Sequence, residues 1–361
     1  MTSALFSPFK LRGLELPNRI VVSPMCQYMA DDGSATDWHL MHLGQLSMGA
    51  GGLLITEATH VSRVGRISNR CLGLYSDENE QALKRVVDFC RLHGVAKLGI
   101  QLAHAGRKGS AHTPQDGGKS LGAAEGAWET VAPSALPFGP GWHVPQALTR
   151  AGLAEVKQQF VQAAQRAARI GFDLAELHIG HGYLLHEFLS PISNQRNDEY
   201  GGNTAGRMRF PTEVFEAVRA VWPKDRVLGV RVSATDWIEG GWTPEETVEF
   251  ARALKALGCD VIDVTSAHLD PRQKIPLAPG YNVQFAEKVR KEAGIPVMAV
   301  GMITRARQAE EIIGGGRADL VAIARAVMDD PRWAWRAARE LGEKAAYPRN
   351  YQRCEPPGWQ P

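Results

Sequence analysis

The sequence predicts an α/β protein with a (β/α)8 TIM barrel, and two observations carry this prediction. Short apolar segments rich in β-branched residues alternate with segments of helical periodicity, which is the pattern of parallel strands joined by helices. Each apolar segment is apolar nearly throughout, as expected for strands whose two faces are both covered. The alternative is an open doubly wound sheet, but no GxGxxG follows the first strand.

Eight segments are predicted as the barrel strands. They are Arg19–Met25, Gly52–Thr59, Lys97–Ala103, Phe172–Ile179, Val227–Ala234, Cys259–Ser266, Pro296–Gly301 and Asp319–Ala324. Between them, DENEQALKRVVDFCRLHG, AEVKQQFVQAAQRAARIG, TPEETVEFARALKALG and TRARQAEEIIGGG have helical periodicity. Thr243 followed by Pro244 predicts an N-cap and a first helical residue, and several of these segments end in glycine, as helices often do.

Three further segments are predicted around the repeat within a single domain of residues 1–361. FKLRGLELPN, before the first strand, predicts a small N-terminal hairpin that forms a lid on the barrel bottom. Residues 104–148 form a long connection after the third strand, and loops of that length are commonly active-site lids. Because this loop follows a strand, we expect it to cap the C-terminal face of the barrel. Residues 343–361 are expected to form a C-terminal tail.

The composition excludes several classes of function. Of 361 residues, 44% are hydrophobic and 22% are charged, and the net charge is +2. Neither a nucleic-acid partner nor a membrane partner is therefore predicted. The first residues, MTSALFSPFK, do not resemble a signal peptide. Five scattered cysteines without a CxxC pair favour a reduced, cytoplasmic protein.

Polar side chains lie at the ends of most predicted strands, where a barrel of this kind carries its active site. These residues are Ser23, Cys26, Gln27, Tyr28, Glu57, Thr59, Gln101, His104, Arg107, Glu176, His178, His181, Arg231 and Arg325. Arg231 is the most informative, because a guanidinium directed at the helices would be buried among apolar groups. We expect it to point into the barrel toward an anionic or electron-rich partner. The alternative is an internal ion pair with Glu176 or Glu57.

Arg325 follows the eighth strand and begins a helix, and Gly301 ends the seventh strand. The loops after these two strands are the usual phosphate site of the fold. A glycine there would let the backbone approach a phosphate closely. The alternative is that Arg325 is an exposed side chain at a helix start.

The segment AELHIGHGY places His178, His181 and Tyr183 at the end of the fourth strand. They could be satisfied polar groups, or two ligands of a metal with Glu57 or His104 as a third, in a metal-dependent barrel hydrolase. They could also be two N–H donors that hold a substrate oxygen as it gains charge, with Tyr183 as the proton donor. Once the other strand ends are considered, this last interpretation is favoured and no metal is predicted.

Five segments together resemble the Old Yellow Enzyme family of FMN-dependent ene-reductases, in that family's order and spacing. They are VVSPMCQYMADDGSATDWH, IQLAHAGRK, HGYLLHEFLSPISNQRNDEYGG, RVSATDW and IARAVMDDPRW. The resemblance covers essentially the whole chain. Cys26 with the pair His178 and His181 is most similar to the thermophilic-like bacterial branch of the family.

The resemblance implies that FMN binds non-covalently in the barrel and is reduced by NADPH or NADH. Ser23, Pro24, Met25 and Cys26 would line the flavin near N5, Ala58 and Gln101 would contact its pyrimidine side, and Arg231 would lie by N1 and O2. Gly301, Ala324 and Arg325 would hold the phosphate. His178 and His181 would bind the activating oxygen of the substrate, Tyr183 would supply the proton, and Tyr28 and Lys108 would shape the substrate pocket.

The substrates implied are α,β-unsaturated carbonyl compounds, nitro compounds or quinones. The resemblance also implies a homodimer or homotetramer in which Tyr351 and Arg353 reach a neighbouring subunit. The alternative for this segment is an ordinary frayed chain end. A third hypothesis for the whole chain is an inert barrel that binds a phosphate-bearing ligand without turnover.

Overall fold

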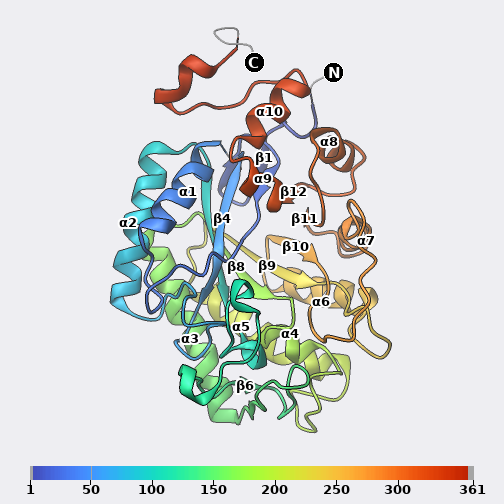
Figure 1. Cartoon of the computed structure of the whole chain (residues 1–361). Helices are drawn as coiled ribbons and strands as arrows, with labels where there is room; N and C mark the ends of the chain where they lie inside the picture. The colour runs from blue at the N-terminus through green and yellow to red at the C-terminus, as the bar shows by residue number, and fades with distance from the viewer. Residues whose placement is uncertain (1–2, 50, 357–361) are drawn as a thin grey trace.

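A closed barrel of eight parallel strands forms the centre of the computed structural model, which describes residues 3–49 and 51–356 (Figure 1). The strands follow one another around the barrel in chain order, and the last pairs with the first. They are β3 (Ile20–Val22), β4 (Leu53–His60), β5 (Lys97–Ala103), β8 (Leu174–Ile179), β9 (Val227–Ser233), β10 (Val261–Thr265), β11 (Val297–Ala299) and β12 (Leu320–Ile323). The predicted fold class is confirmed, and each of the eight predicted segments contains a barrel strand, except that β4 extends one residue beyond its segment, to His60.

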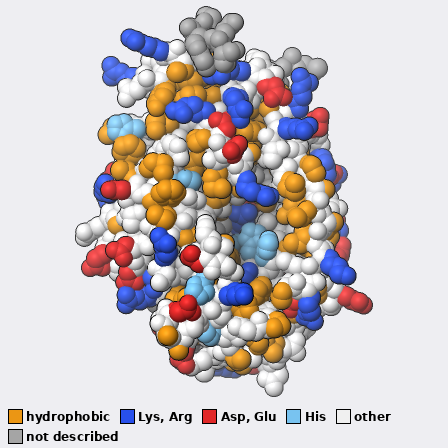
Figure 2. All heavy atoms as spheres, in the orientation of Figure 1, with side chains coloured by type: hydrophobic (Ala, Val, Ile, Leu, Met, Phe, Trp, Pro, Cys, Tyr) orange, Lys and Arg blue, Asp and Glu red, His pale blue; other side chains and the backbone are white. Residues whose placement is uncertain are grey.

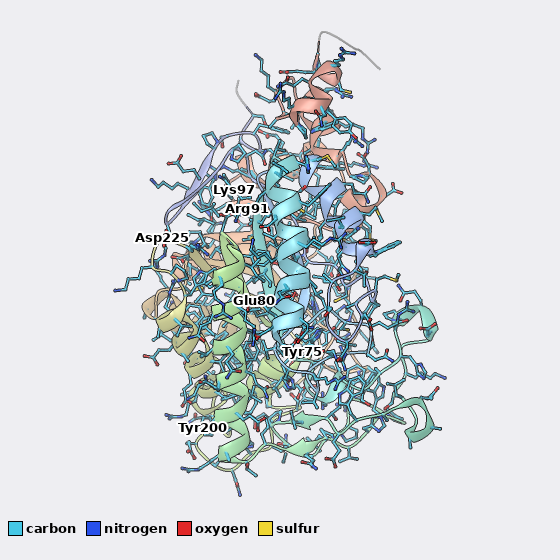
Figure 3. All side chains as sticks on the ribbon, turned by 90° about the vertical axis from the view of Figure 1, so that its left-hand side faces the viewer. Tyr75, Glu80, Arg91, Lys97, Tyr200 and Asp225 are labelled. Atoms are coloured by element: carbon cyan, nitrogen blue, oxygen red, sulfur yellow. The ribbon has the colours of Figure 1, made fainter. Side chains whose placement is uncertain are left out.

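Helices surround the barrel. They are α1 (Asp37–Gly49), α2 (Asp77–His93), α3 (Arg150–Ile170), α4 (Leu184–Leu189), α5 (Thr204–Val221), α6 (Pro244–Ala256), α7 (Val283–Ala293), α8 (Ala306–Gly314), α9 (Arg325–Asp329) and α10 (Trp333–Glu340). Thr243 caps α6 as predicted, because its side chain accepts from the backbone N–H of Glu246. Figure 3 shows α2 and α3 side by side, where Glu80 accepts hydrogen bonds from Arg166 and Arg169. In the part of the chain that the structure describes, no helix is long and apolar enough to cross a bilayer.

The bottom of the barrel is closed by the predicted hairpin. Strands β1 (Phe9–Leu11) and β2 (Leu14–Leu16) pair antiparallel. Leu11, Leu14 and Leu16 are buried in one apolar cluster with residues from the first half of several barrel strands, among them Leu53, Leu174, Val227 and Leu320. Burial of this apolar surface stabilises the fold.

The long connection after β5 forms the cap that the sequence predicts. It contains the short 3-10 helices η1 (Gly106–Lys108), η2 (Pro114–Asp116) and η3 (Ala123–Glu125), and the two-residue strands β6 (Val131–Ala132) and β7 (Gln146–Ala147). Arg107 ties the cap to the loop after β10, because its guanidinium donates to the carbonyl oxygen of Leu269 at 2.9 Å. The cap therefore lies over the C-terminal ends of β8 and β10.

The C-terminal segment turns away from the cap. The 3-10 helix η4 (Arg349–Cys354) lies at the opposite end of the molecule from β6 (Figure 1). Tyr351 packs on the ring of Trp335, and its own ring lies 4.8 Å from the Arg332 guanidinium. Residues 357–361 of the predicted tail lie outside the described residues.

Candidate active site

A cavity of about 540 Å³ opens at the C-terminal ends of the barrel strands. Its walls come from the ends of β9 to β12 and from the turn after β8. The lining residues include His181, Arg231, Thr265, His268, Tyr281, Asn282, Gly301, Met302, Ala324 and Arg325. Figure 2 shows a hollow on this face with histidine and basic side chains at its edge. A volume of this size suits a cofactor or a drug-sized ligand.

Arg231 points into the barrel, as predicted, and its partners explain its position. One terminal nitrogen donates to Ser23 Oγ at 3.2 Å, and Nε lies 3.2 Å from Asp263 Oδ2. Asp263 faces Arg231 in the register of β9 and β10. The alternative of an ion pair with Glu176 or Glu57 is therefore wrong, because the ion-pair partner of Arg231 is Asp263. The sequence contained the signal, because Asp263 is an acid within an apolar strand just as Arg231 is a base within one.

Gln101 and Glu176 lie deeper in the barrel, opposite each other on β5 and β8. The Gln101 amide donates to Glu176 Oε1 at 2.7 Å, and both side chains are buried. Burial, and then the nearby Asp263, raise the pKa of Glu176 to about 8. The barrel interior under the cavity is therefore polar and ionisable.

The imidazoles of His178 and His181 contact each other. His181 Nδ1 lies 3.2 Å from His178 Nε2, and His181 Nε2 lies 3.1 Å from Thr265 Oγ1. Burial, and then the positive charge of Arg231, lower the pKa of both histidines well below the usual value. Both rings are therefore neutral at physiological pH, and neutral imidazoles can donate an N–H to a ligand without carrying charge.

The turn that carries His181 is fixed by contacts with the loop after β10 and with a buried histidine. Gly182 has φ +70°, and a Cβ there would lie 2.4 Å from the carbonyl oxygen of His268. The Gly182 N–H donates to His186 Nδ1 at 2.8 Å, which leaves the proton of that ring on Nε2. His186 Nε2 lies 3.1 Å from Asp236, and both side chains are fully buried. The turn is thus fixed by a buried histidine–aspartate pair that the sequence did not reveal.

Tyr183 and Lys108 meet next to this turn. Lys108 Nζ donates to the carbonyl oxygens of His181 and His268 at 2.9 and 3.0 Å, and lies 5.0 Å from the centre of the Tyr183 ring. Burial lowers the pKa of Lys108 to about 8. Burial also raises the pKa of Tyr183, so this phenol keeps its proton at neutral pH. His178 and Tyr183 lie 5.1 Å apart between ring centres.

The segment after β3 carries Ser23, Pro24, Met25, Cys26 and Tyr28. The backbone is held by Glu57, which accepts the N–H of Gln27 at 3.0 Å. Burial and Glu57 raise the pKa of Cys26, and burial raises that of Tyr28, so both side chains are neutral. Across from this segment, Ala58 follows a register shift in β4 and pairs with Gln101.

The opposite end of the cavity is formed by Gly301, Ala324 and Arg325. Gly301 has φ +118°, a conformation that side-chain-bearing residues rarely adopt. A Cβ at this position would lie 3.0 Å from the Asn282 amide nitrogen. Arg325 begins α9 and is exposed. The geometry provides an open backbone surface and an exposed guanidinium at the same end of the cavity.

Tyr351 and Arg353 do not line this cavity. Tyr351 lies with Met48, Phe89 and Pro348 in a different surface depression, and Arg353 is exposed. Conversely, Thr265, Met302 and His268 line the cavity without having been predicted. Ala267 and His268 both have positive φ values, of 74° and 69°. The sequence pattern does not predict this backbone conformation.

No group of three or more histidine, cysteine, aspartate or glutamate side chains suited to a metal ion occurs within residues 3–49 and 51–356. The two nitrogens of the His181 ring lie against His178 and Thr265.

Comparison with known proteins assigns the chain to a family. Residues 4–344 match the model of the NADH:flavin oxidoreductase / NADH oxidase family. The chain belongs to this family. An NADPH dehydrogenase from Geobacillus sp. (strain WCH70) is 46% identical over 361 residues, which cover 99% of each chain. An NADPH dehydrogenase from Listeria innocua is 46% identical over 354 residues, covering 98% of this chain and 99% of the relative.

Solved structures agree with this assignment to the flavin oxidoreductases. Morphinone reductase superimposes with a TM-score of 0.79 at 27% identity, covering 96% of this chain and 91% of the other. The predicted resemblance to the Old Yellow Enzyme family is confirmed. The protein is a flavin-dependent NAD(P)H oxidoreductase that uses FMN. The residues present fit this cofactor, because the cavity has a glycine-lined, arginine-bearing end and a second buried arginine, Arg231, along its wall.

Proposed function

We propose that the protein reduces activated C=C bonds of α,β-unsaturated carbonyl or nitro compounds, with quinones as further acceptors. The observation that carries this proposal is the continuity of one cavity wall. The wall runs from Gly301 and Arg325 past Arg231 to His181, and Tyr183 stands beside His178 next to this wall. One ligand can therefore contact a phosphate site, a buried cation and the histidine pair in sequence.

FMN, when bound, accepts a hydride from NAD(P)H and passes it to the substrate, and several residues are proposed to hold it. Gly301, Ala324 and Arg325 would bind its phosphate through backbone N–H groups and a guanidinium. Arg231 would face the part of the ring where negative charge accumulates on reduction. Ser23, Pro24, Met25, Cys26, Ala58 and Gln101 are proposed to contact the rest of the ring.

His178 and His181 are proposed to bind the activating oxygen of the substrate. Their neutral rings can donate N–H groups to that oxygen, and Arg231 nearby favours negative charge on it. Tyr183 is proposed to protonate the carbon next to the activating group, since its pKa is raised and its proton is retained until the substrate takes it. Tyr28 and Lys108 would bound the substrate space.

An anaerobic titration tests this proposal. Purified protein should be yellow, NADPH should bleach the flavin absorbance, and a cyclic enone should then restore it with one enone reduced per flavin. NADPH is proposed as the preferred reductant, in line with the names of the relatives. NADH titrated in parallel is the comparison. Flavin that is reduced by NADPH but not reoxidised by any enone, nitroalkene or quinone would contradict the proposed substrate class.

Arg231→Ala tests the proposed cofactor contact. Loss of a charged hydrogen-bonding group is worth about 1.5 to 3 kcal/mol, so FMN should dissociate roughly ten- to a hundredfold more readily. Arg305→Ala, which changes an exposed arginine at the start of α8, is the matched control. Equal FMN retention in the two variants would contradict the role of Arg231.

Tyr351 and Arg353 are proposed to reach the active site of a second subunit in a homodimer or homotetramer. They are assigned to a neighbour because they do not line the cavity of their own chain. Light scattering should give a mass of two or four chains. Arg353→Ala should raise the KM for the enone, whereas Arg349→Ala in the same 3-10 helix should not.

A further inference from the structure

Three ionisable side chains lie close together in the barrel interior below the cavity. They are Glu176 on β8, Arg231 on β9 and Asp263 on β10, with exposed fractions of 1%, 6% and 1%. Asp263 and Arg231 are direct register partners. Glu176 faces Gly229, which has no side chain and precedes Arg231 by two residues on the same face of β9. Two carboxyl groups and one guanidinium thus share a buried space.

Few hydrogen bonds offset the free-energy cost of burying these three charged groups. Glu176 Oε1 accepts from Gln101 at 2.7 Å. Neither carboxylate oxygen of Asp263 has a hydrogen-bond partner within the described part of the chain, although Oδ2 lies 3.2 Å from Arg231 Nε. Arg231 also donates a hydrogen bond to Ser23 Oγ. β5 contributes the uncharged Gln101 to this cluster, and β3 the uncharged Ser23. His178, the register partner of Arg231 on β8, and His181 also face the guanidinium, and burial and that positive charge keep both rings neutral. Burial keeps the proton on Tyr183.

The charges of this cluster do not balance when every group is ionised. Two carboxylates and one guanidinium leave one uncompensated negative charge, and an unpaired buried charge costs several kcal/mol. A proton on one carboxyl group removes that charge. Asp263 lies against the guanidinium and is the better partner for it, so Glu176 is the better proton acceptor. The raised pKa of Glu176, caused by burial and by Asp263, agrees with this assignment.

We propose that Glu176 and Asp263 share one proton at neutral pH, and that this proton sets the net charge that Arg231 and its partners present to FMN. The second half of this statement rests on the proposed placement of Arg231 beside the flavin. With the proton, the three groups sum to zero, and they would not repel negative charge on a flavin bound beside Arg231. Without it, they sum to one negative charge, which opposes reduction.

Protons and electrons balance as follows. NADPH gives a hydride to FMN and becomes NADP+, and Glu176 and Asp263 gain or lose no electrons. Below about pH 8 the shared proton is already present, and reduction leaves it in place. Above that pH, the added negative charge on the flavin makes Glu176 take one proton from solvent. Reduction at high pH therefore consumes one more proton per flavin than reduction at neutral pH.

Infrared spectroscopy of the oxidised protein tests the shared proton without turnover. The Glu187→Gln background is used, because Glu187 is a second buried glutamate whose pKa is raised to about 8. In this background, a carboxylic acid C=O stretch should be present at pH 6.5 and lost at pH 9.5. Glu176→Gln should abolish it. Asp263→Asn should abolish it as well, because Glu176 then becomes the ionised partner of Arg231.

Two results would overturn the shared proton. One is a carboxylic acid band unaffected by Glu176→Gln, and the other is a band that survives Asp263→Asn at pH 6.5. If one variant does not fold, the other alone decides, since each removes a different half of the pair. The experiment uses no substrate, so its failure is separate from failure of the proposed ene reduction.

Stopped-flow reduction by NADPH tests the coupling to FMN. The rate for the Glu187→Gln background should fall above about pH 8 and should stay level in the same background with Glu176→Gln. Proton uptake on reduction at pH 9.5, measured with an indicator dye, should drop by one per flavin in that double variant. Identical pH profiles and proton counts would overturn the coupling.

Discussion

The two ends of the barrel differ in what fills them. At the bottom, leucines of the β1–β2 hairpin pack on apolar residues from the first half of the strands. At the top, the same strands carry Gln101, Glu176, His178, Arg231 and Asp263 into the interior. One end is therefore held by dispersion and apolar burial, and the other by a small number of hydrogen bonds and ion pairs among buried ionisable groups.

This difference teaches where stability and activity are located. Apolar packing at the bottom is tolerant of pH and contributes free energy of unfolding without chemistry. The polar top is costly, because buried ionisable groups without full hydrogen bonding reduce stability. Under the proposed function, those groups are aimed at a ligand. Variants at the top should change activity more than stability, and variants at the bottom should do the reverse.

The largest expected effect comes from His178→Ala combined with His181→Ala. Removing a donor to a developing oxyanion costs about a hundred- to a thousandfold in rate, and both donors are lost here. Reoxidation by the enone should fall by at least that factor, and the long-wavelength band formed with phenols should disappear while FMN stays bound. His112→Ala, a histidine of the cap beside Glu125, is the control. A retained phenol band would contradict the oxygen-binding role.

Tyr183→Phe separates proton transfer from binding at the top. General acid catalysis contributes about a hundred- to ten-thousandfold, so the enone-dependent step should slow by roughly a hundredfold. Reduction of FMN by NADPH needs no such proton and should be unchanged. Stopped-flow measurement of each half-reaction decides. The control is Tyr75→Phe, because the Tyr75 hydroxyl donates to Asp32 and neither residue lines the cavity. Equal slowing of both half-reactions would mean that Tyr183 acts by positioning.

Leu174→Ala tests whether apolar packing at the bottom of the barrel determines stability rather than activity. Leu174 is fully buried in the hairpin cluster, and truncating such a side chain costs about 2 to 5 kcal/mol of unfolding free energy. Denaturant or thermal unfolding should show this loss, whereas the KM for the enone in the folded protein should stay the same. Leu92→Ala, at a side chain 77% exposed, should change neither. A large change in KM without loss of stability would break the division between the two ends.

The smallest expected effect on activity accompanies a pH dependence of stability at the top. Glu187 is fully buried, accepts the N–H of Arg107 at 2.9 Å, and burial raises its pKa to about 8. Its protonated form is favoured in the fold, so stability is lost as pH rises from the unfolded value near 4.5 to about 8. Glu187→Gln removes this titration, so its stability relative to the wild type should rise across that window by up to about 1.4 kcal/mol for each pH unit. Melting temperatures of the variant and the wild type at pH 5 and pH 8.5 measure this change in stability. If the two proteins differ by the same amount at both pH values, the raised pKa of Glu187 is contradicted.

The repeat of strands and helices was determined by the sequence, because apolar periodicity and capping residues such as Thr243 act over a few residues of chain. The direction of Arg231 followed from the same local argument, since only the barrel interior could accept a guanidinium. Its partner was decided by the register of β9 against β10, which brings Asp263 opposite it. The sequence shows the acid but not the pairing.

The turn after β8 shows the same limit most clearly. His178, His181 and Tyr183 were evident as a polar group at a strand end, and their types indicated the chemistry. Only the tertiary structure decided that the pair of His186 and Asp236 accepts the Gly182 N–H of this turn. It also decided that Lys108 of the cap donates to the carbonyl oxygen of His181. The physical reason is that periodicity and capping are local, whereas burial and pKa depend on groups that the fold brings together from distant parts of the chain.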